Sequence, residues 1–216
     1  MERRLAALAA LLAPYPRVAD IGAGSGQLAR RLVADGHLVV ATDLRSGAVR
    51  HLQEQLAGLG LDIRQGAGFM PLGPDEVDAA CVAGLGGRTI AAMLVSDAPS
   101  TRVALVLQPM QDLAAVTARL RSLDRGVGAA QLAASRGRLY PILVCPPNCG
   151  WNGPADVRWD RLGWWLRHDP LWPRWVDTAV ARLQRRHARL MNGPTEDRAA
   201  VLQDIRWLEA QRDVET

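Results

Sequence analysis

The chain has 216 residues, of which 49% are hydrophobic, and a formal net charge of +4. Its length allows one well-filled core with an appendage and excludes two large domains. No uninterrupted apolar run reaches the roughly 18 to 20 residues of a membrane span, three unevenly spaced cysteines do not suit a disulfide framework, and the histidines show no metal-ligand spacing. We therefore expect a cytoplasmic protein without membrane segments or bound metal, whose basic charge permits a nucleic-acid partner without requiring one.

The first predicted element is an amphipathic helix that ends before Pro14. Leu5, Leu8, Leu11 and Leu12 recur on one face of it, and the proline ends it because its ring cannot continue a helix. Arginines followed by a short apolar run also resemble the start of a signal peptide, but the helical spacing favours an amphipathic helix of the folded chain.

An apolar run over residues 18–21 breaks into a glycine-rich turn with the pattern Asp20-x-Gly22-x-Gly24-x-Gly26. Glycine takes positive φ at little cost and lets a ligand approach the backbone. A dinucleotide fold spaces its glycines as GxGxxG, and a triphosphate loop needs a lysine, which this chain lacks. An acid before the first glycine would repel pyrophosphate but can hold the amino group of S-adenosylmethionine, the cofactor we predict. A glycine turn without a ligand is the alternative.

The segment after this turn completes a right-handed βαβ unit. Residues 27–33 have helical apolar spacing, Asp35-Gly36 ends that helix, and residues 37–43 form a buried strand that ends in Asp43. A carboxylate at this strand end can accept both ribose hydroxyls of an adenosine. Capping of the helix that begins near Ser46 is an equally open role for it.

Three further strands are each followed by a turn rich in glycine or proline. The turns are Gly66-Ala67-Gly68-Phe69, which we expect to face an adenine ring, Gly84-Leu85-Gly86-Gly87, and Gln108-Pro109-Met110. The predicted strands span residues 61–65, 77–83 and 102–107, and the predicted helices span 46–59, 88–95 and 112–123.

The alternation of strands and helices stops at Gly126. Two strand-like runs, 127–134 and 139–145, are joined by a turn too short for a helix, so they must pair as an antiparallel hairpin. Five βα units and one hairpin give the α/β fold we predict for residues 1–150, the seven-stranded, doubly wound, Rossmann-like sheet of many S-adenosylmethionine-dependent methyltransferases.

All seven tryptophans lie after residue 150, which marks a composition boundary. For residues 151–216 we predict a Trp-rich linker and a coiled-coil-like tail, with one helix over 171–191, a break at 192–195, and a second helix that runs back as an antiparallel helical hairpin. Arginines crowd the outer faces of the first helix. RNA contact, dimerisation and simple packing on the sheet all remain open for the tail, and we expect a monomer or a weak dimer.

Five segments, spread over nearly the whole chain, carry a more specific resemblance. They are Val18-Ala-Asp-Ile-Gly22, Val82-Ala-Gly-Leu-Gly-Gly-Arg-Thr-Ile90, Leu107-Gln-Pro-Met110, Gly137-Arg-Leu-Tyr-Pro-Ile142 and Leu162-Gly163 before the tail. With them the chain resembles the bacterial tRNA adenine-22 N1-methyltransferases. It departs from that family's usual Ser-Asp-His-Ala-Tyr-Leu-Pro at residues 23–29 and from its Gly-Asp-Gly at residues 66–68.

The resemblance implies S-adenosylmethionine-dependent methylation of N1 of an adenine in tRNA, at position 22 in the D-arm. The alternatives are a methyltransferase that acts on another small molecule or on a protein, and a binding protein that has lost catalytic activity. No side chain is assigned as a general base, because positioning supplies most of the rate. We expect the acceptor slot at Gly86, Gly87, Gln108 and Pro109. The expected cofactor contacts are Asp20, Gly22, Gly24, Gly26, Asp43, Leu44, Gly66, Ala67, Gly68, Ala83, Gly84 and Leu85. The expected contacts to tRNA phosphates are Arg88, Arg136, Arg138, Arg182, Arg185, Arg186 and Arg189.

Overall fold

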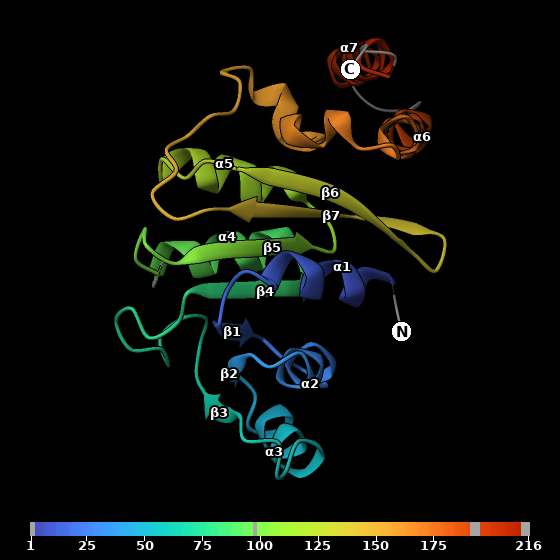
Figure 1. Ribbon diagram of the computed structural model, residues 1–216. Coiled ribbons are helices and arrows are strands. Elements are labelled where there is room, and N and C mark those ends of the chain that lie inside the picture. Colours follow the sequence, from blue (N-terminus) through green and yellow to red (C-terminus); the bar gives the residue numbers. More distant parts are fainter. Residues whose placement is uncertain (1–2, 97–98, 191–194, 213–216) are drawn as a thin grey trace.

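A seven-stranded sheet with strand order β3-β2-β1-β4-β5-β7-β6 forms the centre of the computed structural model, which describes residues 3–96, 99–190 and 195–212 (Figure 1). The first five strands pair in parallel, and β7 runs antiparallel to both β5 and β6. This confirms the predicted doubly wound α/β sheet with a terminal hairpin. The strands are β1 (Arg17–Ile21), β2 (Leu38–Asp43), β3 (Asp62–Gln65), β4 (Ala79–Leu85), β5 (Ala104–Pro109), β6 (Ala129–Ser135) and β7 (Arg138–Cys145).

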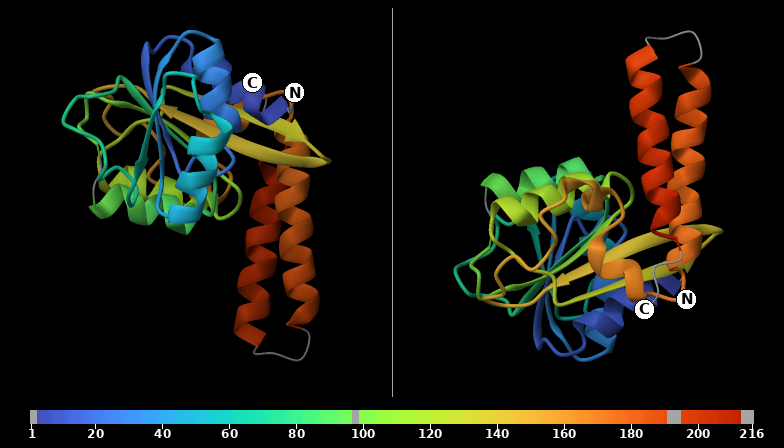
Figure 2. Two further views of the ribbon diagram at one scale, coloured as in Figure 1. Left: turned by 90° about the horizontal axis from the view of Figure 1, so that it is seen from below. Right: turned by 90° about the horizontal axis from the view of Figure 1, so that it is seen from above.

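Helices cover both faces of the sheet (Figure 2). One face carries α1 (Arg3–Leu12), α2 (Gln27–Ala34) and α3 (Ser46–Gln55), and the other carries α4 (Gly87–Ser96) and α5 (Leu113–Ser122). The amphipathic pattern of α1 is confirmed, since Leu8 and Leu12 are fully buried. The helix α3 ends at Gln55, earlier than predicted, because Gly58 and Gly60 turn the chain with φ of +79° and +72°.

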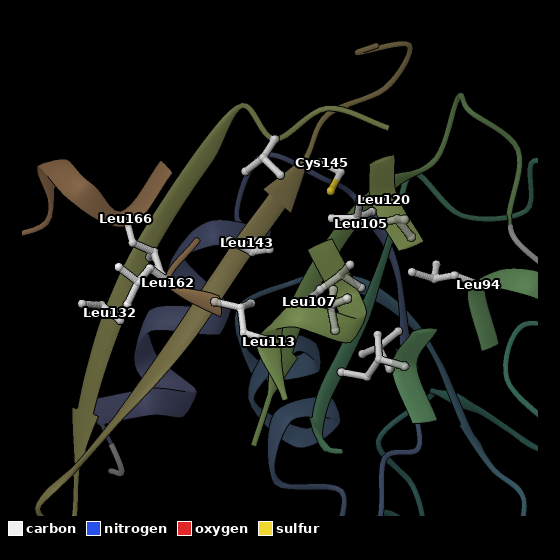
Figure 3. Packing of buried hydrophobic residues seen from close by; sticks show 14 of the residues in the cluster. Leu94, Leu105, Leu107, Leu113, Leu120, Leu132, Leu143, Cys145, Leu162 and Leu166 are labelled. Carbon is white, nitrogen blue, oxygen red and sulfur yellow. The ribbon is translucent and has the colours of Figure 1, made fainter. Parts of the chain in front are cut away.

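The buried strands divide their side chains between two cores. Leu105 and Leu107 pack toward α4 and α5, whereas Val106, between them, packs toward α1 and α2. Figure 3 shows the two leucines among Leu113 and Leu143. A parallel strand covered on both faces needs such a continuous apolar run, because successive side chains point to opposite sides. Replacing the fully buried Leu107 by alanine should therefore destabilise the fold by about 2–5 kcal/mol.

After the sheet, the chain forms two short 3-10 helices and then a long helical hairpin. They are η1 (Val157–Arg161), η2 (Trp164–His168), α6 (Trp172–Arg189) and α7 (Thr195–Ala210). The hairpin extends from the sheet on the side of α4 and α5 (Figure 2). Val176 and Ile205 belong to the same hydrophobic cluster as the α5 side of the sheet, so the tail shares that core.

Two sequence expectations concern the tail and the membrane. The predicted antiparallel hairpin is confirmed, while the last residue of its first predicted helix, 191, and residues 192–194 of the predicted break lie outside the described residues. Within the described residues, no helix has the length and apolar character needed to cross a membrane.

Candidate active site

The turns singled out in the sequence meet at one edge of the sheet. Parallel strands place their carboxyl ends together, on the right in Figure 1, and ligands of open α/β sheets bind at this edge. The N-terminal end of α1, the turn between β6 and β7, and the tail helices lie on the same side of the molecule. The edge is therefore built from both ends of the chain as well as its middle.

The three glycines of the first turn have different roles. All have positive φ, at +71° for Gly22, +57° for Gly24 and +70° for Gly26. A Cβ on Gly26 would lie 2.7 Å from Leu52 and 2.8 Å from Leu56, so this glycine allows the turn to pack on α3. A Cβ on Gly24 would meet only the Gly22 carbonyl, at 3.8 Å. The middle of the turn is thus the part that leaves room for a ligand.

Asp43 faces this turn from the end of β2. One of its oxygens accepts a hydrogen bond from the Gly24 amide at 3.2 Å, and the other accepts from the Arg45 amide at 3.0 Å. The side chain is buried, and its Oδ1 also lies 3.4 Å from Arg45 Nε. Asp43 therefore supports the glycine turn and the residue before α3, but it does not cap the first turn of that helix. Of the two roles left open by the sequence, the ribose contact stays a prediction, because Oδ2 has one donor and retains a second lone pair.

Asp20 is a buried carboxylate with an unused acceptor. It is 4% exposed, and its Oδ2 has no hydrogen-bond partner among the described residues. Burial raises the pKa of Asp20 to about 7, and the nearby carboxylate of Asp43 adds to the rise. Because a buried polar atom without a partner is costly, this oxygen suits a cationic hydrogen-bond donor supplied by a ligand.

The predicted adenine side of the edge adjoins Asp43. The Gly66 amide donates to the Asp43 carbonyl at 3.1 Å, and a Cβ on Gly66 would lie 2.3 Å from Pro71, so the turn is tightly packed. Ala67 and Leu44 are exposed beside it, and Gly68 has φ of +52°. Ala67 and Leu44 are therefore the exposed residues at the ends of β3 and β2, whereas Gly68 is buried against Met93.

A β-bulge shapes the end of β4. The register with β5 shifts between Ala83, which pairs with Gln108, and Leu85, which pairs with Pro109. Gly84 lies between them with φ of +78°, and the strand continues through Leu85, two residues beyond the prediction. Bulges often re-aim side chains beside active sites, and this one lies between the glycine turn and the predicted acceptor slot.

The loops after β4 and β5 are held against each other. The Met110 amide donates to the Leu85 carbonyl at 2.8 Å, and the Gly87 amide donates to the Gln111 carbonyl at 2.9 Å. A Cβ on Gly87 would lie 2.0 Å from the Asp112 carbonyl oxygen, so only glycine permits this approach. The resulting wall is rigid backbone.

A cavity of about 930 Å³ lies beside this wall and extends to α6. Three of the four residues predicted for the acceptor slot line it, namely Gly86, Gly87 and Pro109. Its charge is positive, because six arginines line it and, among the described residues, only two of them are paired with acids, Arg88 with Asp112 at 2.7 Å and Arg161 with Asp204. The arginines that line it are Arg88, Arg138, Arg161, Arg174, Arg182 and Arg185.

The structure brings together some predicted arginines and leaves others apart. Four of the seven, Arg88, Arg138, Arg182 and Arg185, line this cavity. Arg136 lines a neighbouring hollow together with Arg3 and Arg174. Arg186 and Arg189 are exposed on α6 and do not line the cavity. Arg174, one of the arginines expected on the outer faces of the first tail helix, also lines the cavity, and Arg174, Thr178 and Arg182 recur at four-residue spacing on one helix face.

Gln108 differs from the other predicted acceptor residues, because it is fully buried and does not line the cavity. Its Oε1 accepts a hydrogen bond from Arg4 Nη1 at 2.9 Å. Sequence reasoning missed Arg4, since no motif links the first helix to the end of β5.

A doubly wound sheet with buried carboxylates at its first glycine turn and an arginine-lined cavity at the same edge has the arrangement of an α/β protein that binds ligands at the ends of its strands. A family described as a methyltransferase domain matches residues 1–143. The chain belongs to this methyltransferase-domain family. A search of curated proteins finds no match to the chain.

Solved structures share the fold over the full length, tail included. The B. subtilis M1A22 tRNA methyltransferase TrmK aligns with a TM-score of 0.87 and 19% identity, covering 99% of each chain. The Streptococcus pneumoniae protein Sp1610, in complex with S-adenosyl-L-methionine, gives 0.83 and 19%, covering 98% of this chain and 99% of that one. M. capricolum TrmK, in complex with S-adenosyl-homocysteine, gives 0.84 and 15%, covering 99% of this chain and 98% of that one.

Proposed function

We propose that the chain is an S-adenosylmethionine-dependent methyltransferase that methylates N1 of an adenine in tRNA, at position 22 of the D-arm. The observation that carries the proposal is the arginine-lined cavity at the same sheet edge as the glycine turn with its buried carboxylates. The shared fold with TrmK proteins, which includes the tail that completes this cavity, supports the assignment to tRNA.

The residues at the glycine turn fit this cofactor. The unpaired oxygen of Asp20 suits its amino group, and Asp43 at the end of β2 suits its ribose hydroxyls. The exposed residues Leu44 and Ala67 lie at the strand ends next to Asp43, where its adenine would lie. When bound, the cofactor supplies an electrophilic methyl group on a sulfonium.

Methyl acceptance at adenine N1 requires little side-chain chemistry. N1 carries no proton, and its lone pair lies in the ring plane, where it can attack a methyl carbon directly. No base is therefore needed, and alignment of the two atoms supplies most of the rate. Gly86, Gly87 and Pro109 present backbone at the cavity wall, which lets a flat base approach closely. Because N1 lies on the Watson–Crick edge, the base must leave its pair to reach this wall.

The arginines supply the means of holding such a base in place. Arg138, Arg182 and Arg185 form no ion pair with a residue that the structure describes, so their guanidinium groups are available for phosphates. They approach the cavity from β7 and from α6. A tRNA bound between the sheet edge and α6 would then contact both parts of the chain.

The proposal is tested by incubating the protein with S-adenosylmethionine labelled in its methyl group and with an unmodified tRNA transcript. A matched transcript carries guanine at position 22. We expect label in the first transcript and none in the second. Label in both would contradict the position, and label in neither would contradict the tRNA substrate.

A further inference from the structure

Arg4 lies where three strands meet beside the acceptor wall. Its Nη1 donates to Gln108 Oε1, 104 residues away along the chain, and its guanidinium lies over the ring of Tyr140, 5.8 Å from the centroid. A Cβ on Gly84 would come within 3.8 Å of the same Nη1. The first helix thus brings a cationic side chain to the junction of β4, β5 and β7.

The contact with Arg4 fixes the orientation of a buried amide. Gln108 is 0% exposed, and its Nε2 donates to the Pro109 carbonyl at 2.8 Å while its Oε1 accepts from Arg4. Rotating the amide by half a turn would set Nε2 against the guanidinium, donor against donor, and Oε1 against the carbonyl oxygen. Because buried polar groups need partners, Arg4 permits only the observed orientation.

The amide in turn supports the cavity wall. Pro109 lines the cavity, and its carbonyl is held from beneath by Gln108. The next residue, Met110, is held by Leu85 across the bulge. Arg4, Gln108 and Pro109 therefore form a chain of contacts from the first helix to the surface on which an acceptor base would lie.

We propose that Arg4 is a positioning residue for methyl transfer, which acts by holding Gln108 and thereby fixing the Pro109 wall of the acceptor slot. The inference rests on the proposed function and deepens it. It gives the first helix a role in the reaction, although that helix lies outside the motifs at the strand ends.

The kinetic test compares Arg4→Ala, Arg4→Lys, Gln108→Ala and the Arg4→Ala/Gln108→Ala double variant, with Arg50→Ala as the control. Arg50 is an exposed arginine on α3, away from the site. We expect Arg4→Ala to lower kcat by roughly 10- to 100-fold, because small displacements of a positioned acceptor are costly. KM for tRNA and the cofactor dissociation constant should stay within about twofold.

Two comparisons separate positioning from other roles. The double variant should be no slower than either single variant, because both remove one chain of contacts. The lysine variant, whose ammonium can still donate to Oε1, should recover part of the lost kcat. An additive double variant, an unchanged kcat, or a loss confined to KM for tRNA, which would indicate a phosphate contact, would each overturn the positioning role.

A second readout does not depend on activity. In the wild-type protein, the side-chain NH₂ signal of Gln108, assigned by its absence from Gln108→Ala, should be protected from exchange with water. Arg4→Ala should remove this protection and Arg50→Ala should not. Unchanged protection in Arg4→Ala overturns the inference, whereas wild-type protein that shows protection but methylates no tRNA overturns the proposed function alone.

Discussion

The glycine turn after β1 and the cavity beside β4 and β5 lie on the same edge of the sheet but carry opposite charges. The turn holds two buried carboxylates, Asp20 and Asp43. The cavity is lined by six arginines and one acid that is already paired. A compact cation suits the first site and an extended polyanion suits the second.

The two sites should also differ in their response to salt. Buried carboxylates are little screened by ions, whereas exposed arginines that bind phosphates release counterions and lose affinity as salt rises. Cofactor binding is therefore expected to be nearly constant between low and physiological salt, and tRNA binding is expected to weaken steeply.

Replacement of Asp20 by asparagine should have the largest effect. In the proposed cofactor site this carboxylate holds the cofactor's amino group, so we expect cofactor affinity to fall by about 100-fold or more, which corresponds to about 3 kcal/mol. Calorimetry on the purified variant measures this. Glu54→Gln, an exposed carboxylate on α3, is the control and should bind normally. Normal binding by Asp20→Asn would place the cofactor elsewhere.

Removal of two of the cavity-lining arginines of α6 should weaken tRNA binding. We expect Arg182→Ala/Arg185→Ala to lower affinity by roughly 10- to 30-fold and to reduce the salt slope by about 1.5 to 2, because each phosphate contact releases about one counterion. The control is Arg50→Ala/Arg206→Ala, two exposed arginines outside the cavity. Titration of labelled tRNA at several salt concentrations measures both quantities. Equal slopes for the two pairs would argue against the cavity as the tRNA site.

The glycines of the first turn offer a test within one site. Gly26→Ala should destabilise the fold by about 2 kcal/mol, because its Cβ would collide with Leu52 and Leu56 at positive φ. Gly24→Ala should cost about 1 kcal/mol, from the positive φ alone, but should weaken cofactor binding more. Thermal melting with and without the cofactor separates the two effects. A larger loss of stability in Gly24→Ala than in Gly26→Ala would contradict the assignment of Gly26 to packing and of Gly24 to the ligand side of the turn.

The smallest expected effect is a pH dependence of cofactor affinity. With the pKa of Asp20 raised to about 7, protons compete with the cofactor's amino group below that pH, so affinity should fall about tenfold from pH 8 to pH 6. Asp20→Asn should show no such change.

The raised pKa of Asp20 also makes the stability of the cofactor-free protein depend on pH, but stability should fall as pH rises, whereas cofactor affinity should increase. The folded, cofactor-free protein holds this proton more tightly than the unfolded chain, so Asp20 makes the protein less stable as pH rises from about 4 toward 7. Melting of wild type and Asp20→Asn across this range measures the difference.

Much of the fold and the cofactor edge follows from local sequence patterns. The apolar runs before Gly22 and Asp43 and the alternation of strands and helices place both residues at one sheet edge, because parallel strands share their carboxyl ends. The strand hairpin near Gly137 follows from a turn too short to hold a helix. These inferences need only the order of elements along the chain.

The remaining features depend on contacts between distant segments. The hydrogen bond from Arg4 to Gln108 joins residues 104 positions apart. The rotation of α6 decides that Arg182 faces the cavity and Arg186 does not, although the sequence treats both alike. The collision that requires glycine at position 26 involves α3 rather than a ligand. Periodicity cannot determine such contacts, because they depend on how whole elements pack.

Identification of the methylated nucleoside tests the central claim most directly. Transfer RNA treated with the protein and S-adenosylmethionine is digested to nucleosides, and a parallel sample is mapped by primer extension, which stops at a base methylated on its Watson–Crick edge. We predict 1-methyladenosine and a stop at position 22. A different methylated nucleoside, such as N6-methyladenosine, or unmodified tRNA would contradict the proposed function.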